Sequence, residues 1–550
     1  MPTPPAQTPE EQPRRRLSTD VLVVGAGPTG LMAGAWCAAL GVQALVVDGK
    51  SGPTRESRAL GLHSRSLEIY RQLGLAQEVL ARATPGDTVS PGYRHRTLGT
   101  VPLGQLGRTL TPFPGITVLE QSANEQLLAE YLQARRRPVA WGTSFRRFSE
   151  AATTSHRPVT VDLDSPEGPV QVTARYVVAA DGASSPVRNA LGIGFEGATH
   201  HFEFYVLDAH GVTGTERGIT LRFSREQFML AFPMGSDGRS GARARLLGIL
   251  RAEDRAGTAP GGADAHDEAR ARESLADEFG VHYAGTDWYS TYRVHHRVAA
   301  AFRSGSVFLA GDAAHIHSPV GAQGMNTGLQ DAQNIVTKIA DVLTGRAPAE
   351  SLDRYEAERR PVALNLVRTT DVVFGAVTSA ALGARFLRTV AFPALAPWAL
   401  RLVPRSPAGG RLFGYLSQIR IHYWMPGTEA LQADGGCRRR GRVLGRRLPW
   451  VPDAGHADPL SGAVPGVDGP ADNHEALDAA RWQVHAYGPA AAEIARELAE
   501  RHREKAAGPD GPASGLPVLR FRAAPEAGLP NGTALLVRPD GFVAALEPAA

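Results

Sequence analysis

The stretch GDAAHIHSPVGAQGMN, residues 311–326, constrains the fold of this chain more than any other. The apolar run 307–310 before it is typical of a buried strand, and the apolar spacing after it predicts a helix that starts near Asn326. Asp312 therefore stands at the carboxyl end of a strand, where open α/β sheets bind their ligands. This order presents a carboxylate to a sugar hydroxyl, and the N–H groups of a helix N-terminus to an anion.

A second glycine-rich turn has the order of a dinucleotide-binding fingerprint. The apolar run 20–24 leads into GAGPTG, a helix-forming stretch follows, and a second apolar run ends at Asp48. Gly25 permits the tight turn, Gly27 lets a pyrophosphate approach the backbone, and Gly30 lets helix and strand pack closely. Asp48 occupies the place of the acid that accepts from ribose hydroxyls. The pattern predicts an adenine dinucleotide, without distinguishing FAD from NAD.

A third motif favours FAD. The run 176–180 is another buried-strand pattern, and it leads into DGASSPVR, residues 181–188. Together, GAGPTG, DGASSPVR and GDAAHIHSPVGAQGMN resemble the group A flavoprotein monooxygenases, the single-component aromatic hydroxylases of the p-hydroxybenzoate hydroxylase type. The resemblance covers residues 18–370. One departure is Ala322, where relatives usually carry a second glycine, and it leaves the path of this loop open.

Two further positions match the family. Arg58 in SRALGLHSRSLEIYRQLGL and Gln121 in LEQSANEQLL stand where an Arg and a Gln contact the FAD pyrophosphate and ribityl regions in relatives. Without the three motifs, they would be interpreted as a surface arginine and a helix-capping glutamine. The residues expected to bind the cofactor are Gly25, Gly27, Thr29, Gly30, Asp48, Arg58, Gln121, Asp181, Gly182, Asp312, Pro319, Gly324, Met325 and Asn326.

The resemblance implies a reaction that uses non-covalently bound FAD, NADPH or NADH as a transient co-substrate, and O₂. In the family, reduced flavin traps O₂ as a C4a-hydroperoxide, whose distal oxygen goes to an electron-rich aromatic ring. The protein supplies orientation, exclusion of water and electrostatics. Backbone N–H groups of residues 324–326 would stabilise the anionic reduced flavin.

The catalytic acid or base is left unassigned. The candidates are Pro319, which would line the oxygen-activating face, and His315 and His317, which lie near the expected flavin. His295 and His296 are better explained by packing or capping. No metal is expected at this site.

Between DGASSPVR and GDAAHIHSPVGAQGMN, alternating patterns around 202–206, 219–223, 228–232 and 245–250 predict the strands of a sheet. This sheet resembles the family's substrate-binding domain, which lies over the reacting edge of the flavin. Phe232 and Pro233, at the end of one strand, are expected to face the pocket. Arg222 could bind a carboxylate, but it shares a face with Thr220 and Ser224, so solvation is the alternative. The strands over 202–232 carry few charges, and an unpaired buried charge is costly, so the substrate is expected to be largely neutral. The thioredoxin-like C-terminal domain resembles the branch that handles larger phenols, so a bulky polycyclic aromatic is expected, such as a polyketide intermediate of antibiotic biosynthesis.

Three other functions share part of this pattern. Baeyer–Villiger oxygenation runs on the same scaffold, and no residue of this sequence separates it from hydroxylation. Flavin-dependent halogenases usually carry a WxWxIP motif and a catalytic lysine, but the motif does not occur here and Lys50 lies beside the dinucleotide acid. A non-catalytic flavin-binding or NAD-binding protein is the third, and the three intact motifs argue against it.

A chain of 550 residues is too long for one core. The predicted fold is α/β: a Rossmann-like FAD-binding domain with an inserted β-sheet substrate domain, followed by a C-terminal thioredoxin-like α/β domain. The predicted ranges are 1–17 for a disordered tail, 18–190 and 290–370 for the FAD-binding domain, 191–289 for the substrate domain, 371–426 for a helical segment and 427–550 for the thioredoxin-like domain.

The thioredoxin-like domain resembles that of the phenol hydroxylase and polyketide hydroxylase branch. It lacks a CxxC pair, so packing and subunit contact are its expected roles, and a homodimer is left open. Residues 534–543 predict a hairpin about the turn Pro539-Asp540-Gly541. Residues 253–268, rich in Gly, Ala and Asp, are expected to form a loop.

Composition limits the partners. The formal net charge is +4 and no basic run alternates with aromatic residues, so nucleic acid binding is unsupported. The arginines between 438 and 447 are expected on a solvated surface. Cys37 and Cys437 lie far apart, so neither a disulfide nor a zinc site is expected, and Cys37 is expected to be an inert core thiol. Charges and prolines interrupt the apolar segment 371–397, so no transmembrane helix is expected, and the protein is expected in the cytoplasm.

Overall fold

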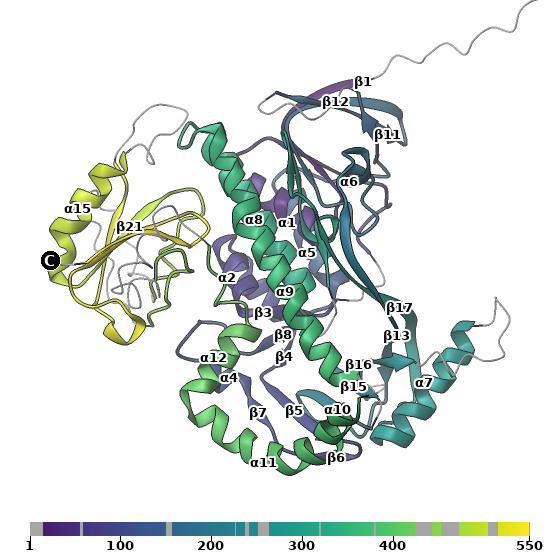
Figure 1. The fold of residues 1–550 in the computed structure, drawn as a ribbon. Coiled ribbons are helices and arrows are strands. Elements are labelled where there is room, and N and C mark those ends of the chain that lie inside the picture. The colour runs from purple at the N-terminus through teal and green to yellow at the C-terminus, as the bar shows by residue number, and fades with distance from the viewer. Residues whose placement is uncertain are drawn as a thin grey trace, which may run out of the picture.

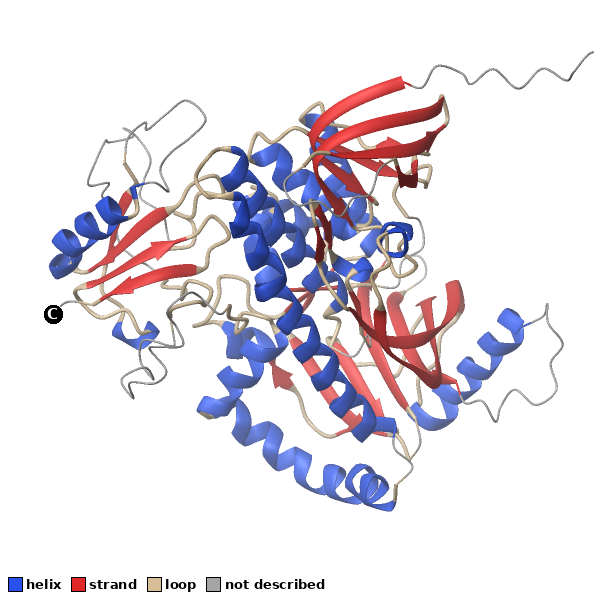
Figure 2. Ribbon diagram, turned by 45° about the horizontal axis from the view of Figure 1, so that its top comes forward, coloured by secondary structure: helices blue, strands red, loops and turns tan. Residues whose placement is uncertain are grey.

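The computed structural model describes residues 15–54, 59–149, 157–225, 227–236, 241–250, 263–317, 321–378, 381–423, 443–452, 472–503 and 515–548. These residues form two large sheets with helices packed against them, a small sheet in the C-terminal region and a second small sheet of β3 (Gly61–His63), β8 (Ile116–Val118) and β4 (Thr84–Gly86) (Figure 1). Figure 2 shows the small C-terminal sheet on one side of a central group of helices and both large sheets on the other.

The first large sheet is mostly parallel. Its strands lie in the order β10-β11-β12-β1-β2-β9, with β19 continuing along β12 and β18 beside β19. Strands β9, β2, β1, β12 and β19 run parallel, so their carboxyl ends share one edge of the sheet. The bounds are β1 (Arg15–Val24), β2 (Ala44–Asp48), β9 (Ala140–Trp141), β10 (Ser144–Phe148), β11 (Val159–Ser165), β12 (Gly168–Ala179), β18 (Arg303–Ser304) and β19 (Val307–Leu309).

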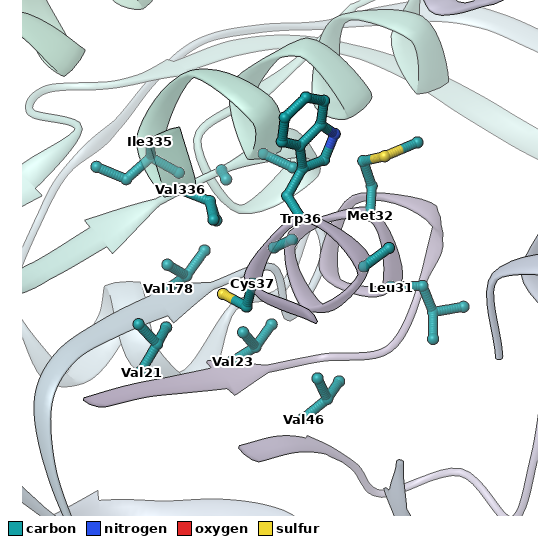
Figure 3. Packing of buried hydrophobic residues seen from close by; sticks show 14 of the residues in the cluster. Val21, Val23, Leu31, Met32, Trp36, Cys37, Val46, Val178, Ile335 and Val336 are labelled. Atoms are coloured by element: carbon teal, nitrogen blue, oxygen red, sulfur yellow. The ribbon is translucent and has the colours of Figure 1, made fainter. Parts of the chain in front are cut away.

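Helices bury one face of this sheet in the largest apolar core of the molecule. Figure 3 shows side chains of α1, among them Trp36 and Cys37, packed between the strands and α8, and both are fully buried. Burial raises the pKa of the Cys37 thiol to about 12, as suits an inert core thiol. The helices of this region are α1 (Pro28–Ala39), α2 (Ser64–Gln72), α3 (Ala76–Arg82), α5 (Gln121–Ala134), α6 (Pro186–Ala190) and α8 (Gly324–Leu343).

The second large sheet has the strand order β20-β17-β13-β16-β15-β14-β5-β6, with β7 paired to β5. The strands predicted around 202–206, 219–223, 228–232 and 245–250 are confirmed as parts of β13 to β16. Strands β5 to β7 join them from within the range predicted for the FAD-binding domain, and the domain boundaries themselves stay a prediction. The bounds are β5 (Thr88–Tyr93), β6 (Arg96–Thr97), β7 (Val101–Pro102), β13 (Phe195–His210), β14 (Ile219–Phe223), β15 (Phe228–Ser236), β16 (Ala242–Leu250), β17 (Gly285–Ala299) and β20 (His315–Ile316).

Helix α7 (Ala263–Phe279) covers one face of the second sheet. Leu275 and Phe279 are fully buried there against strand residues such as Leu207 and Leu246. The loop predicted for 253–268 is therefore wrong from Ala263 onward, because its Ala-rich composition also suits a helix that buries an apolar side; residues 251–262 lie outside the described part. The other face of the sheet packs against Leu60 and Val118 of the predicted FAD-binding domain, called the first domain below.

Helices follow α8 and, within the range 371–426 predicted to be helical, continue to Leu416, whereas residues 417–423 are not helical. The 3₁₀ turn η3 (Ala349–Asp353) leads into α9 (Arg354–Thr378), and beyond it one helical stretch is drawn along the lower edge of Figure 1. That stretch comprises α10 (Leu382–Phe386), the π-helical turn η4 (Leu387–Ala391), α11 (Phe392–Leu402) and the 3₁₀ turn η5 (Val403–Arg405), and α12 (Pro407–Leu416) comes next. Across the described ranges, none of the helices combines the length and the apolar character needed to span a bilayer. Smaller elements nearby are β3 (Gly61–His63), β4 (Thr84–Gly86), β8 (Ile116–Val118) and α4 (Leu103–Gly107).

The C-terminal domain has a four-stranded sheet in the order β22-β21-β23-β24. Strands β21 and β22 are parallel, with α15 between them in the chain, and β23 and β24 are antiparallel to their neighbours, as in a thioredoxin-like domain. The hairpin predicted for 534–543 is confirmed, with the amide of Arg538 donating to the carbonyl of Phe542 at 2.9 Å. Cys437 lies outside the described residues. The bounds are β21 (Gln483–Tyr487), α15 (Ala492–Arg501), β22 (Val518–Phe521), β23 (Thr533–Val537) and β24 (Val543–Glu547).

Strand β1 begins inside the predicted tail. Arg15 is already paired with Val170 of β12, and its side chain forms an ion pair with Glu167 at 3.2 Å. The last residues of the range 1–17 are therefore strand, because Leu17 packs partly against the core below it. Residues 1–14 lie outside the described part.

Candidate functional site

The three glycine-containing motifs meet at the shared edge of the first sheet, as their positions after β1, β12 and β19 predict. The amide of Ala180 donates to the carbonyl of Val24 at 2.7 Å, and the amide of Ala310 donates to that of Ala179 at 2.9 Å. A Cβ atom on Gly25, whose φ is +100°, would lie 2.3 Å from the carbonyl oxygen of Ala180. The first turn must therefore be glycine for the first two motifs to come this close.

The first turn fits the pyrophosphate of a dinucleotide. Helix α1 has Gly27 as its N-cap residue, with no side chain capping its amides and no acidic residue in its first turn. A Cβ atom on Gly27 would have no protein atom within 4 Å, so the space beside this turn is open. An uncapped helix N-terminus beside open space is an anion-binding arrangement. At Gly30, in contrast, a Cβ atom would lie 1.8 Å from the Gly25 carbonyl oxygen, so this glycine serves packing.

Asp48 shapes the same turn. One carboxylate oxygen accepts from the amide of Ala26 at 2.6 Å, and the other accepts from the amide of Lys50 at 2.8 Å. Each oxygen can accept a second hydrogen bond, so both remain able to receive a ribose hydroxyl. The position at the end of β2 is as predicted, and the ribose contact stays a prediction.

Thr29 and Arg188 connect the motifs to one another. The hydroxyl of Thr29 lies so close to Gly311 and Gly328 that Cβ atoms there would be 2.4 Å and 2.2 Å from it. Arg188, which ends the second motif, donates to the carbonyl of Ala313 in the third at 2.9 Å. These two side chains hold the three turns in one constellation.

Asp181 organises the second motif. Its carboxylate accepts from the hydroxyl of Ser185 at 2.6 Å and from the amide of Val187 at 3.0 Å, at the start of α6. Burial raises the pKa of this carboxyl, although the two hydrogen bonds oppose the shift. Gly182 has φ +82° and open space around its Cβ position, which leaves room for a ligand at this turn. The contacts of both residues with a cofactor stay predictions.

Asp312 is exposed at the end of β19, in the 3₁₀ turn η2 (Gly311–Ala313). Surrounding protein partly desolvates the carboxyl and raises its pKa, and the nearby His315 opposes the shift. Helix α8 begins at Gly324, two residues before the predicted start, and no side chain caps its N-terminus. The third motif thus brings a carboxylate and an uncapped helix N-terminus to the edge that the first motif also lines.

His63, which the sequence interpretation did not include, holds the turn before α8. Its Nε2 donates to the carbonyl of Gly321 at 2.8 Å, with the carbonyl of Ala322 at 3.2 Å. The ring is buried, and burial lowers its pKa to about 4. Because both partners of Nε2 are carbonyl oxygens, the neutral ring must carry its proton there. Ala322 has φ +53°, a left-handed conformation that a residue with a side chain adopts at a cost of roughly 1–2 kcal/mol.

Asn326 completes this anchor. Its side-chain amide donates to the carbonyls of Gly61 and Ala322, each at 2.8 Å, and its Oδ1 accepts from the amide of His63 at 2.8 Å. The side chain is therefore fully occupied by protein partners. Only the backbone N–H of Asn326 is left for the predicted cofactor contact, which stays a prediction. Met325 packs partly against the main core.

The catalytic candidates have different outcomes. The ring of His315 is buried, its Nε2 bonds to Asp331 of α8 at 2.7 Å, and it stacks beside Phe302, so these contacts give it a structural part while its catalytic role stays a prediction. His317 lies next to the start of α8, with Nε2 3.6 Å from the Cβ position of Gly324, and its role stays a prediction. Pro319 and Arg58 lie outside the described residues.

Gln121 stands at the first position of α5, where its side-chain amide donates to Glu125 at 2.8 Å. Glu125 is buried and also accepts from the amide of Thr54 at 2.8 Å and from Lys50 at 3.3 Å. This cluster fixes the chain between β2 and the segment that contains Arg58. The flavin contact of Gln121 stays a prediction.

The second sheet turns an apolar face toward the first domain. Phe232 is buried on this face, packed with Leu60 and Val118 of the first domain. Partly exposed apolar side chains extend the same face, namely Leu230, Met234, Trp288 and Tyr292. Arg245 is also buried here, and its Nε and Nη2 donate to the two carboxylate oxygens of Asp208 at 2.6 Å and 2.7 Å. The face therefore combines aromatic surface with a charge that is already neutralised.

Two of the predicted substrate residues lie on the other side of this sheet. Pro233 is paired with Ala244, so strand alternation turns it toward α7, away from Phe232. Arg222 is buried on that face as well, where it donates to the carbonyl of Phe279 at the end of α7. Both substrate assignments, and the solvated alternative for Arg222, are thus wrong. The alternation of side chains along β14 was predicted correctly, but helix α7, which covers this face, was not predicted.

Comparisons with known proteins agree with this geometry. A family model described as FAD binding domain matches residues 18–370. The rifampicin monooxygenase of Streptomyces venezuelae is 38% identical over 356 residues, which cover 64% of this chain and 70% of that protein. The 6-methylpretetramide 4-monooxygenase of Streptomyces rimosus is 32% identical over 542 residues, covering 96% and 90%. The structure of the anhydrotetracycline hydroxylase OxyS from Streptomyces rimosus superposes with a TM-score of 0.70 at 29% identity, covering 97% and 96%.

Proposed function

The chain belongs to the FAD binding domain family and is an FAD-dependent monooxygenase, and on that premise we propose that it hydroxylates a bulky, largely neutral aromatic substrate with NADPH or NADH as reductant and O₂ as oxygen donor. The names of its relatives point to polycyclic aromatic compounds of the tetracycline and rifampicin kinds. The substrate, the reductant and the hydroxylation itself are the proposed parts.

The observation that carries the substrate proposal is the buried pair of Arg245 and Asp208 on the face toward the flavin site. A benzoate-type substrate needs a cation for its carboxylate, because an unpaired buried charge is costly. Arg245 is already neutralised by two hydrogen bonds, and Arg222 points toward α7. The aromatic and aliphatic side chains around Phe232 instead favour stacking and apolar contact.

Bound and reduced FAD would supply the oxygen-activating chemistry. The N-terminus of α1 and the open space at Gly27 would hold the pyrophosphate, and Asp48 would accept from the ribose. Asp312 would accept from the ribityl chain, and amides at the start of α8 would stabilise negative charge on the ring. His63 would position those amides by fixing the turn before them. The apolar face of the second sheet would orient the aromatic ring and exclude water.

Steady-state kinetics with product analysis tests the proposal. The purified protein is expected to be yellow and to oxidise NADPH or NADH faster when anhydrotetracycline, rifampicin or a phenolic anthraquinone is added. Its kcat/KM for at least one of these is expected to exceed that for p-hydroxybenzoate, with one oxygen gained on an aromatic carbon. A preference for p-hydroxybenzoate would contradict the neutral substrate. A lactone or ester product in NMR spectra would replace hydroxylation by Baeyer–Villiger oxygenation.

A charge variant tests the observation behind it. Asp208→Asn leaves Arg245 without its carboxylate and is expected to lower kcat/KM for the neutral substrate relative to that for p-hydroxybenzoate. The matched control is Asp287→Asn, since Asp287 pairs with Arg243 at 3.3 Å at a partly exposed position. Equal ratios in both variants would show that the pair has no part in substrate choice.

A further inference from the structure

The helical stretch α10–η4–α11 carries an unusual exposed surface, because large apolar side chains face solvent along its whole length. The exposed fractions are 83% for Leu382, 60% for Phe386, 50% for Val390, 65% for Leu395, 66% for Trp398 and 65% for Leu402. We call these six residues the apolar stripe. Contiguous exposed apolar surface on a folded protein marks an interaction site.

The spacing of the stripe follows the helix. Leu382, Phe386 and Val390 are four residues apart, and Leu395, Trp398 and Leu402 repeat at three and four. The five-residue step between the two halves includes the end of the π-helical turn η4, which closes a wider turn than an α-helix does. The two halves therefore stay on one side of the helix.

The opposite side of this helix is packed against the protein. Phe392 contacts Phe223 of β14 edge to face, with ring centroids 5.4 Å apart. Ala396 is buried, and Leu400 lies close enough to Gly99 that a Cβ atom there would be 3.0 Å from it. The helix, drawn along the lower edge of Figure 1, is thus held in place by its inner side, while the residues of the apolar stripe are exposed.

The charged side chains of this segment are all arginines. Between Asp371 and Glu429 the sequence contains six arginines and neither aspartate, glutamate nor lysine. Four of the arginines are exposed, namely Arg401, Arg405, Arg411 and Arg420. Arg401 and Arg405 come from the same helical end as Trp398 and Leu402, so the guanidinium groups lie at the border of the apolar stripe. Arginine side chains can extend from such a border to reach anionic groups.

We propose that the apolar stripe and its bordering arginines dock this protein on an anionic lipid surface. A helix with aromatic and aliphatic residues on one side and arginines beside it is the pattern of an interfacial membrane anchor. A two-fold contact between two copies is disfavoured, because it would bring one arginine-rich, acid-free segment against another. The lipid bilayer supplies both apolar depth and the negative charge that the segment lacks.

Vesicle binding of the holoenzyme tests this proposal. The protein is expected to float with vesicles made of equal parts of phosphatidylglycerol and phosphatidylcholine, and not with vesicles of phosphatidylcholine alone. Leu395→Ser with Trp398→Ser is expected to abolish flotation. Arg401→Gln with Arg405→Gln is expected to weaken it roughly 30-fold, because each cation near an anionic surface contributes about fivefold. High salt is expected to release the wild-type protein.

Matched controls separate docking from a general change in surface. Leu80→Ser removes an exposed leucine of α3, and Arg501→Gln with Arg503→Gln removes two exposed arginines of the C-terminal domain. Both controls are expected to bind vesicles like the wild type. All substituted side chains of the stripe are mostly exposed, so an unchanged flavin spectrum is expected and shows that folding is intact.

Three outcomes would overturn the proposal. One is absence of binding to anionic vesicles, and another is equal binding to neutral ones. The third is binding that the stripe variant leaves unchanged. Sedimentation velocity identifies the main alternative, since self-association that the stripe variant removes, without vesicle binding, would assign the surface to a second copy of this chain.

Discussion

Helix α8 is buried on two sides that differ in chemistry. One side packs against α1 and the first sheet through apolar residues, which are Leu329, Ala332, Ile335, Val336 and Ile339. The other side meets α2, α9 and the C-terminal domain through polar residues, which are Asp331, Gln333, Asn334, Lys338 and Asp341. Apolar burial is strong but not directional, whereas a buried charge needs a particular partner. The apolar side therefore stabilises α8, and the charged side fixes its position.

The charged side centres on Glu358 of α9. Its carboxylate accepts from Lys338 of α8 at 2.7 Å and from Arg538 of the C-terminal hairpin at 2.8 Å. Burial alone would raise the pKa of this carboxyl, but Arg538 and Lys338 outweigh burial and hold the pKa well below its ordinary value. Burial lowers the pKa of Lys338 to about 8. The hairpin tip also bonds to α2, where Arg65 donates to the carbonyl of Asp540 at 2.6 Å.

The largest effect is expected from breaking the charged side. Arg538→Ala leaves Asp540 and Glu358 without their shared cation and is expected to lower the free energy of unfolding by about 3–5 kcal/mol. On the apolar side, Ile335→Val is expected to cost only about 0.5–1.5 kcal/mol. Chemical denaturation followed by circular dichroism measures both. Arg501→Ala, which removes a surface ion pair with Glu547, is the control and is expected to cost less than about 1 kcal/mol. Equal costs for Arg538→Ala and Arg501→Ala would erase the distinction between the two sides.

A smaller effect is expected at the flavin edge, where α8 begins. Asp312→Ala is expected to weaken FAD binding by about 1.5–3 kcal/mol, or roughly 10-fold to 150-fold, by removing a charged acceptor for a ribityl hydroxyl. FAD titration of the apoprotein measures this. Asp353→Ala removes an exposed acid that ends η3 and pairs with Arg303, and it is expected to leave the affinity unchanged. Unchanged affinity in Asp312→Ala would remove this residue from the site.

The turn before α8 is expected to add a pH dependence. The folded protein keeps His63 neutral, with a pKa of about 4 against an ordinary value of 6.5. Since the unfolded chain then binds the proton more readily, the contribution is complete above about pH 6.5 and is lost as pH falls toward 4. The expected slope is up to about 1.4 kcal/mol per pH unit.

The variant His63→Gln isolates that contribution, because a glutamine amide can donate to the same carbonyls but does not titrate. Its stability is expected to fall less steeply than that of the wild type between pH 6.5 and 4, in denaturation series at stepped pH. Parallel slopes for wild type and His63→Gln would rule out this source of acid sensitivity.

The smallest effect is expected from Ala322→Gly. Ala322 has φ +53°, so glycine relieves roughly 1–2 kcal/mol of strain while adding freedom to the unfolded chain, with a net gain of about 0.5–1 kcal/mol. Ala129→Gly in the interior of α5 is expected to have the opposite sign, a loss of roughly 0.5–1 kcal/mol. Thermal unfolding of both variants checks the two signs. A destabilised Ala322→Gly would mean that the methyl group is needed where it lies, 3.0 Å from the Cβ position of Gly61.

Much of the fold and the outline of the site could be predicted from sequence because their signals are local. A strand, a glycine turn and a helix lie next to one another at Gly25 and again at Asp312, and parallel strands bring such turns to one edge. The hairpin at Asp540 has the same kind of short-range signal.

The rest could not be predicted, because it depends on contacts between distant segments. His63 bonds to a carbonyl 258 residues away in sequence, and only its position just before α2 hints at a role. The sequence placed Arg222 on the correct face of β14. Whether that face meets the substrate depends on where α7 packs, and α7 covers it. Arg447 was expected in solvent, yet it is buried and donates to Glu68 at 3.0 Å. Arginine has the same sequence signature in solvent and in a buried ion pair.

The hairpin tip at Arg538 has a consequence for how this protein is made. Arg538 follows its partner Glu358 by 180 residues. At a synthesis rate of about 5–20 residues per second, the ribosome needs roughly 10–40 s to cover that distance. During this interval the nascent chain already contains all three flavin motifs, while Glu358 and Lys338 still await the cation that completes their cluster. Translation speed through the last third of the message could therefore decide whether the nascent domain captures FAD before or after the hairpin closes over α8.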